Sequence, residues 1–152
     1  MDHYFTDNRH LAENRKEISF RFWCFNVSFI TDNGVFSKDS VDFGTRVLLN
    51  TLHEHEEELG NQLLDMGCGY GVVGIVTKKA WPDKQVEMVD VNPRAVELAR
   101  DNAEKNIRYG SVSQLFPHKN SCFAVNPEFS QINYKLSHAE SGFYSLDRKS
   151  VV

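Results

Sequence analysis

The sequence predicts an α/β fold with a parallel sheet, preceded by a β-hairpin. Two short apolar runs, at residues 61–66 and 86–90, have the length and composition of buried strands, and each is followed by a helical pattern. A glycine-rich stretch at residues 67–74 joins the first strand to its helix. Strands that alternate with helices form βαβα units, in which the strands pair in parallel.

The N-terminal segment predicts a pair of antiparallel strands. Apolar residues alternate with polar ones from Ile18 to Phe22 and again from Val27 to Phe29, with a turn near residues 24–26. Spacing with a period of two indicates strands that bury one face. We therefore expect a hairpin ahead of the parallel sheet.

A first helix is expected to begin near Gly44, because apolar residues follow at helical spacing, with Asp42 as its cap. It ends in the charged run of residues 53–58. His53 and His55, two positions apart in this run, would point about 200° apart on a helix, so they cannot share a metal ion. No metal site is predicted.

The central segment supplies the alternating strands and helices. After the glycine-rich stretch, a helix is expected from Ile75 to Trp81, and the second strand then runs to Asp90. Asn92 can cap the next helix, Pro93 suits its first position, and its apolar face extends through residue 106.

Composition restricts the class of protein. The chain has 152 residues, 41% of them hydrophobic and 25% charged, with a formal net charge of -4, which is typical of one globular domain and argues against a surface that coats nucleic acid broadly. It lacks both a run of about 18 apolar residues and the apolar core of a signal peptide. Its three cysteines are widely spaced. We expect a cytoplasmic protein with reduced thiols and no membrane segment.

The composition changes at Asn106. Residues 1–106 carry 12 Lys+Arg and 18 Asp+Glu, whereas residues 107–152 carry 5 and 3, and the second segment holds 8 of the 12 serines. Hydrophobic periodicity also ends there. We therefore expect a domain at residues 1–106 and a different kind of segment at residues 107–152.

The glycine-rich stretch and the next strand end together indicate a nucleoside-containing cofactor. Glycines let the backbone turn tightly and approach a ligand closely, and a carboxylate at Asp90 can accept both ribose hydroxyls. Gly69, Gly71 and Gly74 satisfy the dinucleotide pattern, which keeps NAD as an alternative. Asp65, however, would repel a pyrophosphate and suits a cationic amino-acid group, which favours S-adenosylmethionine.

This region resembles the first motif of class I S-adenosylmethionine-dependent methyltransferases. The run that carries the resemblance is Leu64-Asp65-Met66-Gly67-Cys68-Gly69-Tyr70-Gly71, with residues 86–90 as the acidic second motif. Residues 31–37 and 41–45 resemble the small-domain methyltransferases related to bacterial 16S ribosomal RNA guanine-N2 enzymes. The resemblance covers roughly residues 3–106 and implies a Rossmann-like class I methyltransferase domain.

The resemblance implies roles for matching residues toward S-adenosyl-L-methionine. Asp65 would hold the ammonium group, Asp90 would bind the ribose hydroxyls, and Val91 would lie beside the adenine. The methionine end would contact the glycine-rich stretch at Gly67, Cys68, Gly69 and Gly71. Three residues would close the pocket: Phe36, Ser37 and Thr45. Structural interpretations stay open, with the glycines as a tight turn, Cys68 as a small filler and Asp90 as a helix cap.

The resemblance also implies an Asn-Pro-Pro-aromatic turn that orients the target amine for methyl transfer. The nearest string is Asn126-Pro127-Glu128-Phe129, which replaces the second proline by Glu128 and follows only 20 residues after Asn106. We expect this match to be a chance occurrence. The catalytic residues are therefore unassigned, with Asn126 and Pro127 as the only candidates.

The segment after Asn106 is short for the seven-stranded sheet that the resemblance implies. Five further strands with their connections need roughly 80 residues, whereas 152 - 106 leaves 46. We expect a truncated domain followed by an aberrant or divergent tail. Residues 147–152 resemble the translation of a sequencing-library adapter, which would be excluded from reasoning about the fold.

The expected reaction is methyl transfer from S-adenosylmethionine to a nitrogen of RNA, with a ribosomal RNA guanine, free or in the small subunit, as substrate. This chain is expected to be inactive or nearly so, since the target-amine site is missing. Four alternatives stay open: an NAD-dependent oxidoreductase fragment, a non-catalytic cofactor-binding remnant, and methyltransferases for protein glutamine or for small molecules. No oligomeric state is predicted.

Overall fold

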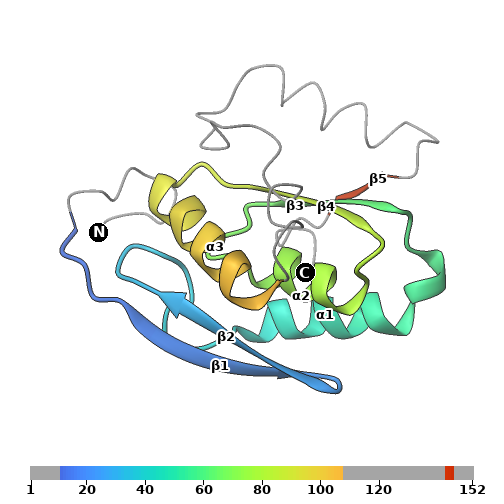
Figure 1. The fold of residues 1–152 in the computed structure, drawn as a ribbon, viewed down its shortest axis with the longest axis horizontal. Helices are drawn as coiled ribbons and strands as arrows, with labels where there is room; N and C mark the ends of the chain where they lie inside the picture. Colours follow the sequence, from blue (N-terminus) through green and yellow to red (C-terminus); the bar gives the residue numbers. More distant parts are fainter. Residues whose placement is uncertain (1–10, 108–142, 146–152) are drawn as a thin grey trace.

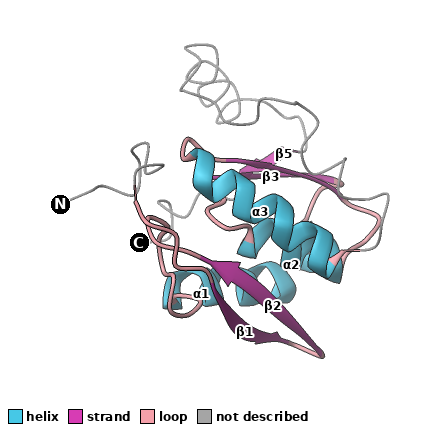
Figure 2. Ribbon diagram, turned by 60° about the vertical axis from the view of Figure 1, so that its left-hand side comes forward, coloured by secondary structure: helices cyan, strands magenta, loops and turns pink. Residues whose placement is uncertain are grey.

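The computed structural model describes residues 11–107 and 143–145, and these form three layers (Figure 1). A parallel sheet lies on one side, three α-helices cover one of its faces, and a β-hairpin lies beyond the helices. Figure 2 shows the same order of layers from a second direction. The predicted α/β fold with an N-terminal hairpin is confirmed.

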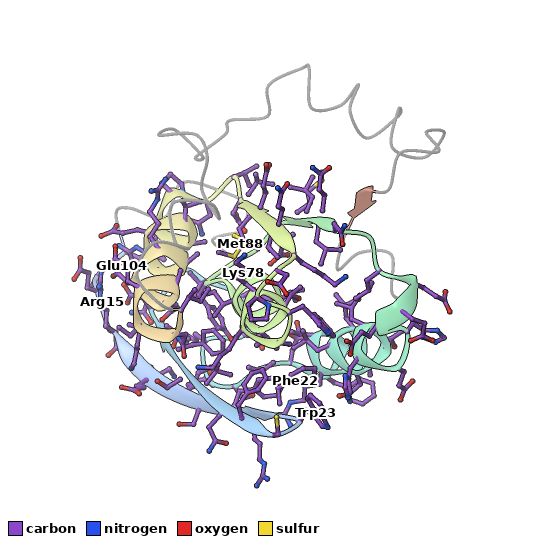
Figure 3. The ribbon with its side chains drawn as sticks, turned by 45° about the vertical axis from the view of Figure 1, so that its right-hand side comes forward. Arg15, Phe22, Trp23, Lys78, Met88 and Glu104 are labelled. Carbon is purple, nitrogen blue, oxygen red and sulfur yellow. The ribbon has the colours of Figure 1, made fainter. Side chains whose placement is uncertain are left out.

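The hairpin consists of β1 (Lys16–Phe22) and β2 (Phe25–Thr31), paired antiparallel. Phe22 lies opposite Phe25, so the connection has two residues, Trp23 and Cys24, and lies slightly earlier than the predicted turn. Trp23 adopts a φ of 48°, because two-residue hairpin loops favour the left-handed region. Its side chain is 64% exposed at the tip of the hairpin (Figure 3).

The sheet has the strand order β4-β3-β5 in the described residues. β3 (Gln62–Met66) pairs in parallel with β4 (Gln85–Val89), with Leu63 opposite Val86 and Asp65 opposite Met88. β5 (Phe143–Ser145) pairs in parallel with the other side of β3. This short strand belongs to the segment for which the sequence shows no periodicity, and residues 108–142 and 146–152 of that segment lie outside the described residues.

Polar side chains cap two of the three α-helices. Asp42 caps α1 (Phe43–Glu54) by accepting a hydrogen bond from the Thr45 amide, as predicted. Asn92 caps α3 (Pro93–Asn106), whose bounds match the prediction. A short 3-10 helix, η1 (Glu56–Glu58), follows α1. None of the helices in residues 11–107 is both long and apolar enough to cross a membrane.

The second helix begins earlier than predicted. α2 (Val72–Ala80) begins at Val72, whereas the sequence predicted a start at Ile75 and placed Gly74 in the turn. Gly74 instead lies in the first turn of the helix, where a Cβ atom would come within 2.3 Å of Met88 Sδ on β4. Figure 3 shows Met88 between β4 and α2. This glycine therefore permits close helix–strand packing rather than a turn.

The hairpin is joined to α3 by side-chain amides as well as by apolar packing. Asn102 is fully buried, and it accepts from the Ile30 amide at 2.6 Å and donates to the Ile30 carbonyl at 2.9 Å. Asn106, one turn later, makes the same pair of bonds with Ser28. The two side chains satisfy backbone groups along the edge of β2 that have no strand partner on that side. The hairpin thereby becomes part of one core with the helices.

Candidate functional site

Three segments meet at the carboxyl-terminal ends of β3 and β4. They are the glycine turn (residues 67–71), residues 90–92 after β4, and the 33–37 loop that follows the hairpin. The Gly69 amide donates to Asp90 Oδ2 at 2.7 Å, and the Tyr70 hydroxyl donates to the Ser37 carbonyl at 3.1 Å. The structure thus brings together the two motifs and the loop that the sequence predicted to share one site.

The glycine turn depends on left-handed backbone conformations. Gly67, Gly69 and Gly71 have φ values of 75°, 56° and 97°, which disfavour any residue with a Cβ atom. The surroundings of two of them differ. A Cβ atom at Gly71 would lie 2.8 Å from Ile75 Cδ1, whereas one at Gly67 would meet no atom of residues 11–107 or 143–145 within 4 Å. Gly71 therefore packs against the helices, while Gly67 borders open space into which a ligand can fit.

Asp90 is held rigidly at the end of β4. Its Oδ2 accepts from the Gly69 amide, and its Oδ1 accepts from the Asn92 amide at 2.8 Å. The helix cap is Asn92, so the interpretation of Asp90 as a simple cap is wrong. Because each carboxylate oxygen has a second lone pair, Asp90 can still accept hydrogen bonds from ligand hydroxyls. Val91 beside it is 39% exposed, so an apolar surface adjoins the carboxylate.

Asp65 is fully buried at the other strand end. Its Oδ2 accepts from the Gly74 amide at 2.9 Å, in the first turn of α2. A carboxylate at this position compensates the unsatisfied N–H groups and the positive end of the helix dipole. Asp65 therefore stabilises the start of α2, and its predicted contact with a ligand ammonium group stays a prediction.

The remaining predicted residues have different surroundings. Cys68 is fully buried in the core, in agreement with the interpretation of its thiol as a small filler. Thr45 is also buried, and its hydroxyl donates to Asp42 Oδ2 at 2.7 Å, so it belongs to the cap of α1.

Phe36 is 47% exposed on the 33–37 loop. Ser37 donates through its hydroxyl to the Ser40 carbonyl, which stabilises the end of this loop. Asn126 and Pro127 lie outside the described residues.

Several residues that shape the site were not predicted to do so. Tyr70 is buried and reaches Ser37, and Asn102 donates to the Tyr70 carbonyl at 2.9 Å. The partly buried Arg94 pairs with the buried Asp32 at the start of the 33–37 loop, with 3.7 Å between Nη1 and Oδ2. Asn92 was predicted only as a cap. The sequence holds little sign of the Asp32–Arg94 pair. Asp32 precedes the turn-forming dipeptide Asn33-Gly34, but Arg94 lies 62 positions later in the chain.

Two charged pairs on the surface each shift the pKa of one member. Lys16 donates to Asp39 and holds the pKa of that carboxyl below its ordinary value. The hydrogen bond from His55 to Glu58 raises the pKa of the imidazole. Within residues 11–107 and 143–145, no three His, Cys, Asp or Glu side chains are grouped as metal ligands would be. The chemistry available at the strand ends is therefore hydrogen bonding to carboxylates and backbone, with apolar contact beside it.

Comparisons with known proteins agree with this geometry. The family model described as "Methyltransferase small domain" matches residues 26–130. A Bacillus subtilis protein, described as uncharacterized protein YbxB, is 43% identical over 105 residues, which are 69% of this chain and 51% of that protein. The ribosomal RNA small subunit methyltransferase C of Haemophilus influenzae is 37% identical over 87 residues, 57% of this chain and 26% of the relative.

A solved structure is also similar. It is the T. thermophilus 16S rRNA N2 G1207 methyltransferase (RsmC) in complex with AdoMet and guanosine, with a TM-score of 0.55 and 27% identity. The similarity covers 60% of this chain and 25% of that one. This chain thus spans about half the length of the Bacillus relative and about a quarter of the other two proteins. The matched residues include all of β2 after Phe25, the glycine turn and Asp90, and the chain belongs to the methyltransferase small domain family.

Proposed function

We propose that this chain binds S-adenosylmethionine and that the parent reaction is methyl transfer to a nitrogen of RNA, with N2 of a ribosomal RNA guanine as the target. The single observation that carries the proposal is the hydrogen bond from the Gly69 amide to the Asp90 carboxylate. This bond joins the predicted ribose acceptor to the predicted methionine-binding turn in one rigid unit. The names of two relatives, both ribosomal RNA methyltransferases, support the RNA target.

The residues at the strand ends fit such a cofactor. Gly67 borders open space, which allows close approach of the methionine end to the backbone. Asp90 would accept the ribose hydroxyls, and the exposed side chains of Val91 and Phe36 would cover the adenine. S-adenosylmethionine supplies a methyl group on a sulfonium centre, and the carboxylate of Asp65 would favour the cationic end of the molecule by its charge.

The role of these residues in the reaction would be positioning. Holding the methyl donor in one orientation converts transfer into an effectively unimolecular step once a target nitrogen is in line. Neither a metal nor a covalent intermediate with the protein is needed for this chemistry. Asn126 and Pro127 remain the only candidates for contact with the target amine.

Cofactor binding can be tested by calorimetric titration of the 152-residue chain with S-adenosylhomocysteine and, in parallel, with NAD. We expect binding of S-adenosylhomocysteine alone, and a loss of tenfold or more in affinity for Asp90→Ala, since a carboxylate that accepts two hydroxyls is removed. Asp101→Ala is the matched control, because Asp101 pairs with Arg15 on the surface of α3. Preferential binding of NAD, or full affinity in Asp90→Ala, would contradict the proposal.

The RNA target requires a separate assay. The chain is incubated with S-adenosylmethionine that carries a labelled methyl group and with deproteinised 16S ribosomal RNA, and nucleosides are separated after digestion. Turnover above background, with the label in N2-methylguanosine, would support the target and overturn the prediction that this chain is inactive. In parallel incubations that replace the RNA by protein or by small amines, label in either substrate would move the proposal to the corresponding alternative.

A further inference from the structure

The 33–37 loop forms one wall of the candidate cofactor site, although it lies outside the parallel sheet and its helices. It connects the hairpin to the segment before α1 and carries the exposed ring of Phe36. Val35 is buried and anchors the middle of the loop in the core. Backbone carbonyl groups at both ends of the loop accept hydrogen bonds from side chains elsewhere in the chain. The Asn33 and Gly34 carbonyls accept from Arg94 and Asn92 at the start of α3, and the Ser37 carbonyl accepts from Tyr70.

Asn92 makes two different hydrogen bonds with the two ends of its side chain. Its Oδ1 accepts from the Arg94 amide at 3.1 Å and caps α3, while its Nδ2 donates to the Gly34 carbonyl at 3.0 Å. Capping alone needs only the oxygen, and serine or aspartate would serve equally well there. The amide nitrogen adds a connection between the α3 N-terminus and the loop, across 58 positions of sequence.

Arg94 holds the base of the same loop. Its guanidinium donates to the Asn33 carbonyl at 3.2 Å and to the Leu11 carbonyl at 2.7 Å. It also pairs with the buried carboxylate of Asp32, which in turn accepts from the Asn33 amide at 2.7 Å. An arginine can bind several acceptors at once through its planar donors, so one side chain fixes both the loop and the chain that precedes β1.

From these contacts we infer that Asn92 and Arg94 are positioning residues of the cofactor site, which hold the 33–37 loop against the strand end that carries Asp90. The inference rests on the proposed function. Asn92 follows Asp90 by two positions, and its own amide donates to Asp90 Oδ1. The N-terminus of α3 thus orients Asp90, the proposed acceptor for the ribose hydroxyls, and also the 33–37 loop, which would cover the adenine.

The discriminating variant is Asn92→Ser, because serine keeps a capping oxygen but cannot donate to the Gly34 carbonyl. We expect its affinity for S-adenosylhomocysteine to fall about fivefold, the effect of one lost hydrogen bond, with a urea midpoint close to that of the unchanged chain. Asn92→Ala removes both bonds and should lower the affinity and the urea midpoint together. Arg94→Ala would also leave the buried Asp32 carboxylate uncompensated, so it cannot separate positioning from stability.

The matched control is Arg15→Ala. Arg15 also joins the chain before β1 to α3, through Glu97 and Asp101, but it lies on the surface and contacts neither the loop nor the glycine turn. We expect its affinity for S-adenosylhomocysteine to be unchanged. If Asn92→Ser binds S-adenosylhomocysteine as tightly as the wild-type chain, the inference is overturned. If the wild-type chain does not bind S-adenosylhomocysteine at all, the proposed function is overturned instead.

Amide hydrogen exchange of the ligand-free chain gives a second readout that does not depend on binding. In Asn92→Ser, amides of the 33–37 loop should exchange several-fold faster, while those in the first turn of α2 keep their protection. Equal protection of the loop in both chains would show that Asn92 does not hold it. If both regions lose protection together, Asn92 supports the whole fold, and the inference that it positions the loop is wrong.

Discussion

The two sides of the candidate site keep their shape by different physical means. The glycine turn is held by its own backbone conformation and by close packing, since Gly67, Gly69 and Gly71 all adopt positive φ values and Gly71 abuts α2 and α3. The 33–37 loop is held by side chains of distant residues. Local residue type therefore encodes one side, whereas the other depends on where folding places Tyr70 and the start of α3.

The substitution with the largest expected effect is Gly71→Ala. A Cβ atom there would lie 2.8 Å from Ile75 Cδ1 and 3.3 Å from the Ala99 Cα atom, at a φ of 97°. Strain and overpacking together should lower the free energy of unfolding by about 3 kcal/mol, measured by urea denaturation. Gly44→Ala, in the first turn of α1 without a positive φ, is the control. Its Cβ atom would lie 3.3 Å from Asp42 Oδ1, and the higher helix propensity of alanine should offset this contact, so the change should be small. A neutral Gly71→Ala would show that packing does not hold the turn.

Asn102→Ala tests a residue that is hydrogen-bonded both to Tyr70 in the glycine turn and to Ile30 in β2, the strand that precedes the 33–37 loop. It removes three hydrogen bonds and leaves the Ile30 amide and carbonyl and the Tyr70 carbonyl without that partner. We expect a loss of about 2 kcal/mol in the free energy of unfolding. Asn106→Ala removes the corresponding bonds to Ser28 at a more exposed position, so its loss should be smaller. The reverse order of the two losses would contradict this assignment.

Gly67→Ala separates conformation from packing within the glycine turn. Its φ of 75° is unfavourable for alanine, but the added Cβ atom would lie within 4 Å of no atom in the part of the chain that the structure describes. We expect a loss of about 1 kcal/mol in stability, less than for Gly71→Ala, together with weaker binding of S-adenosylhomocysteine because the methyl group occupies the ligand's space. Urea denaturation and calorimetry on the same variant check both parts. Unchanged binding would place the methionine end elsewhere.

Ser37→Gly should have the smallest effect. Ser37 has a φ of 56°, so glycine relieves strain at this end of the loop, while the hydroxyl bond to the Ser40 carbonyl is lost and the unfolded chain gains freedom. These contributions oppose one another, and we expect a change within about 0.5 kcal/mol by urea denaturation. A large loss would mean that residue type also determines the shape of this loop and would remove the contrast with the glycine turn.

Local patterns predicted much of the fold. The sequence shows the alternation of the hairpin, the apolar runs of β3 and β4, and the bounds of α3 with its cap at Asn92. Each of these features depends on residues that are close together in the chain. The start of α2 was predicted three residues too late, because it depends on a contact between residues that are distant in the sequence. Gly74 is a turn residue by local propensity, but its contact with Met88 on the next strand places it inside the helix.

The candidate site divides in the same way. The glycine turn, the acidic residue at the end of β4 and the family could be predicted from the sequence alone, because residue type and spacing specify the backbone conformations and the charge. Three features follow from the folded structure alone: Asp65 is buried at the start of α2, Tyr70 reaches Ser37, and Asn92 and Arg94 hold the 33–37 loop. Those contacts join atoms that folding brings together from distant positions, and no local pattern records which acceptor a donor will meet.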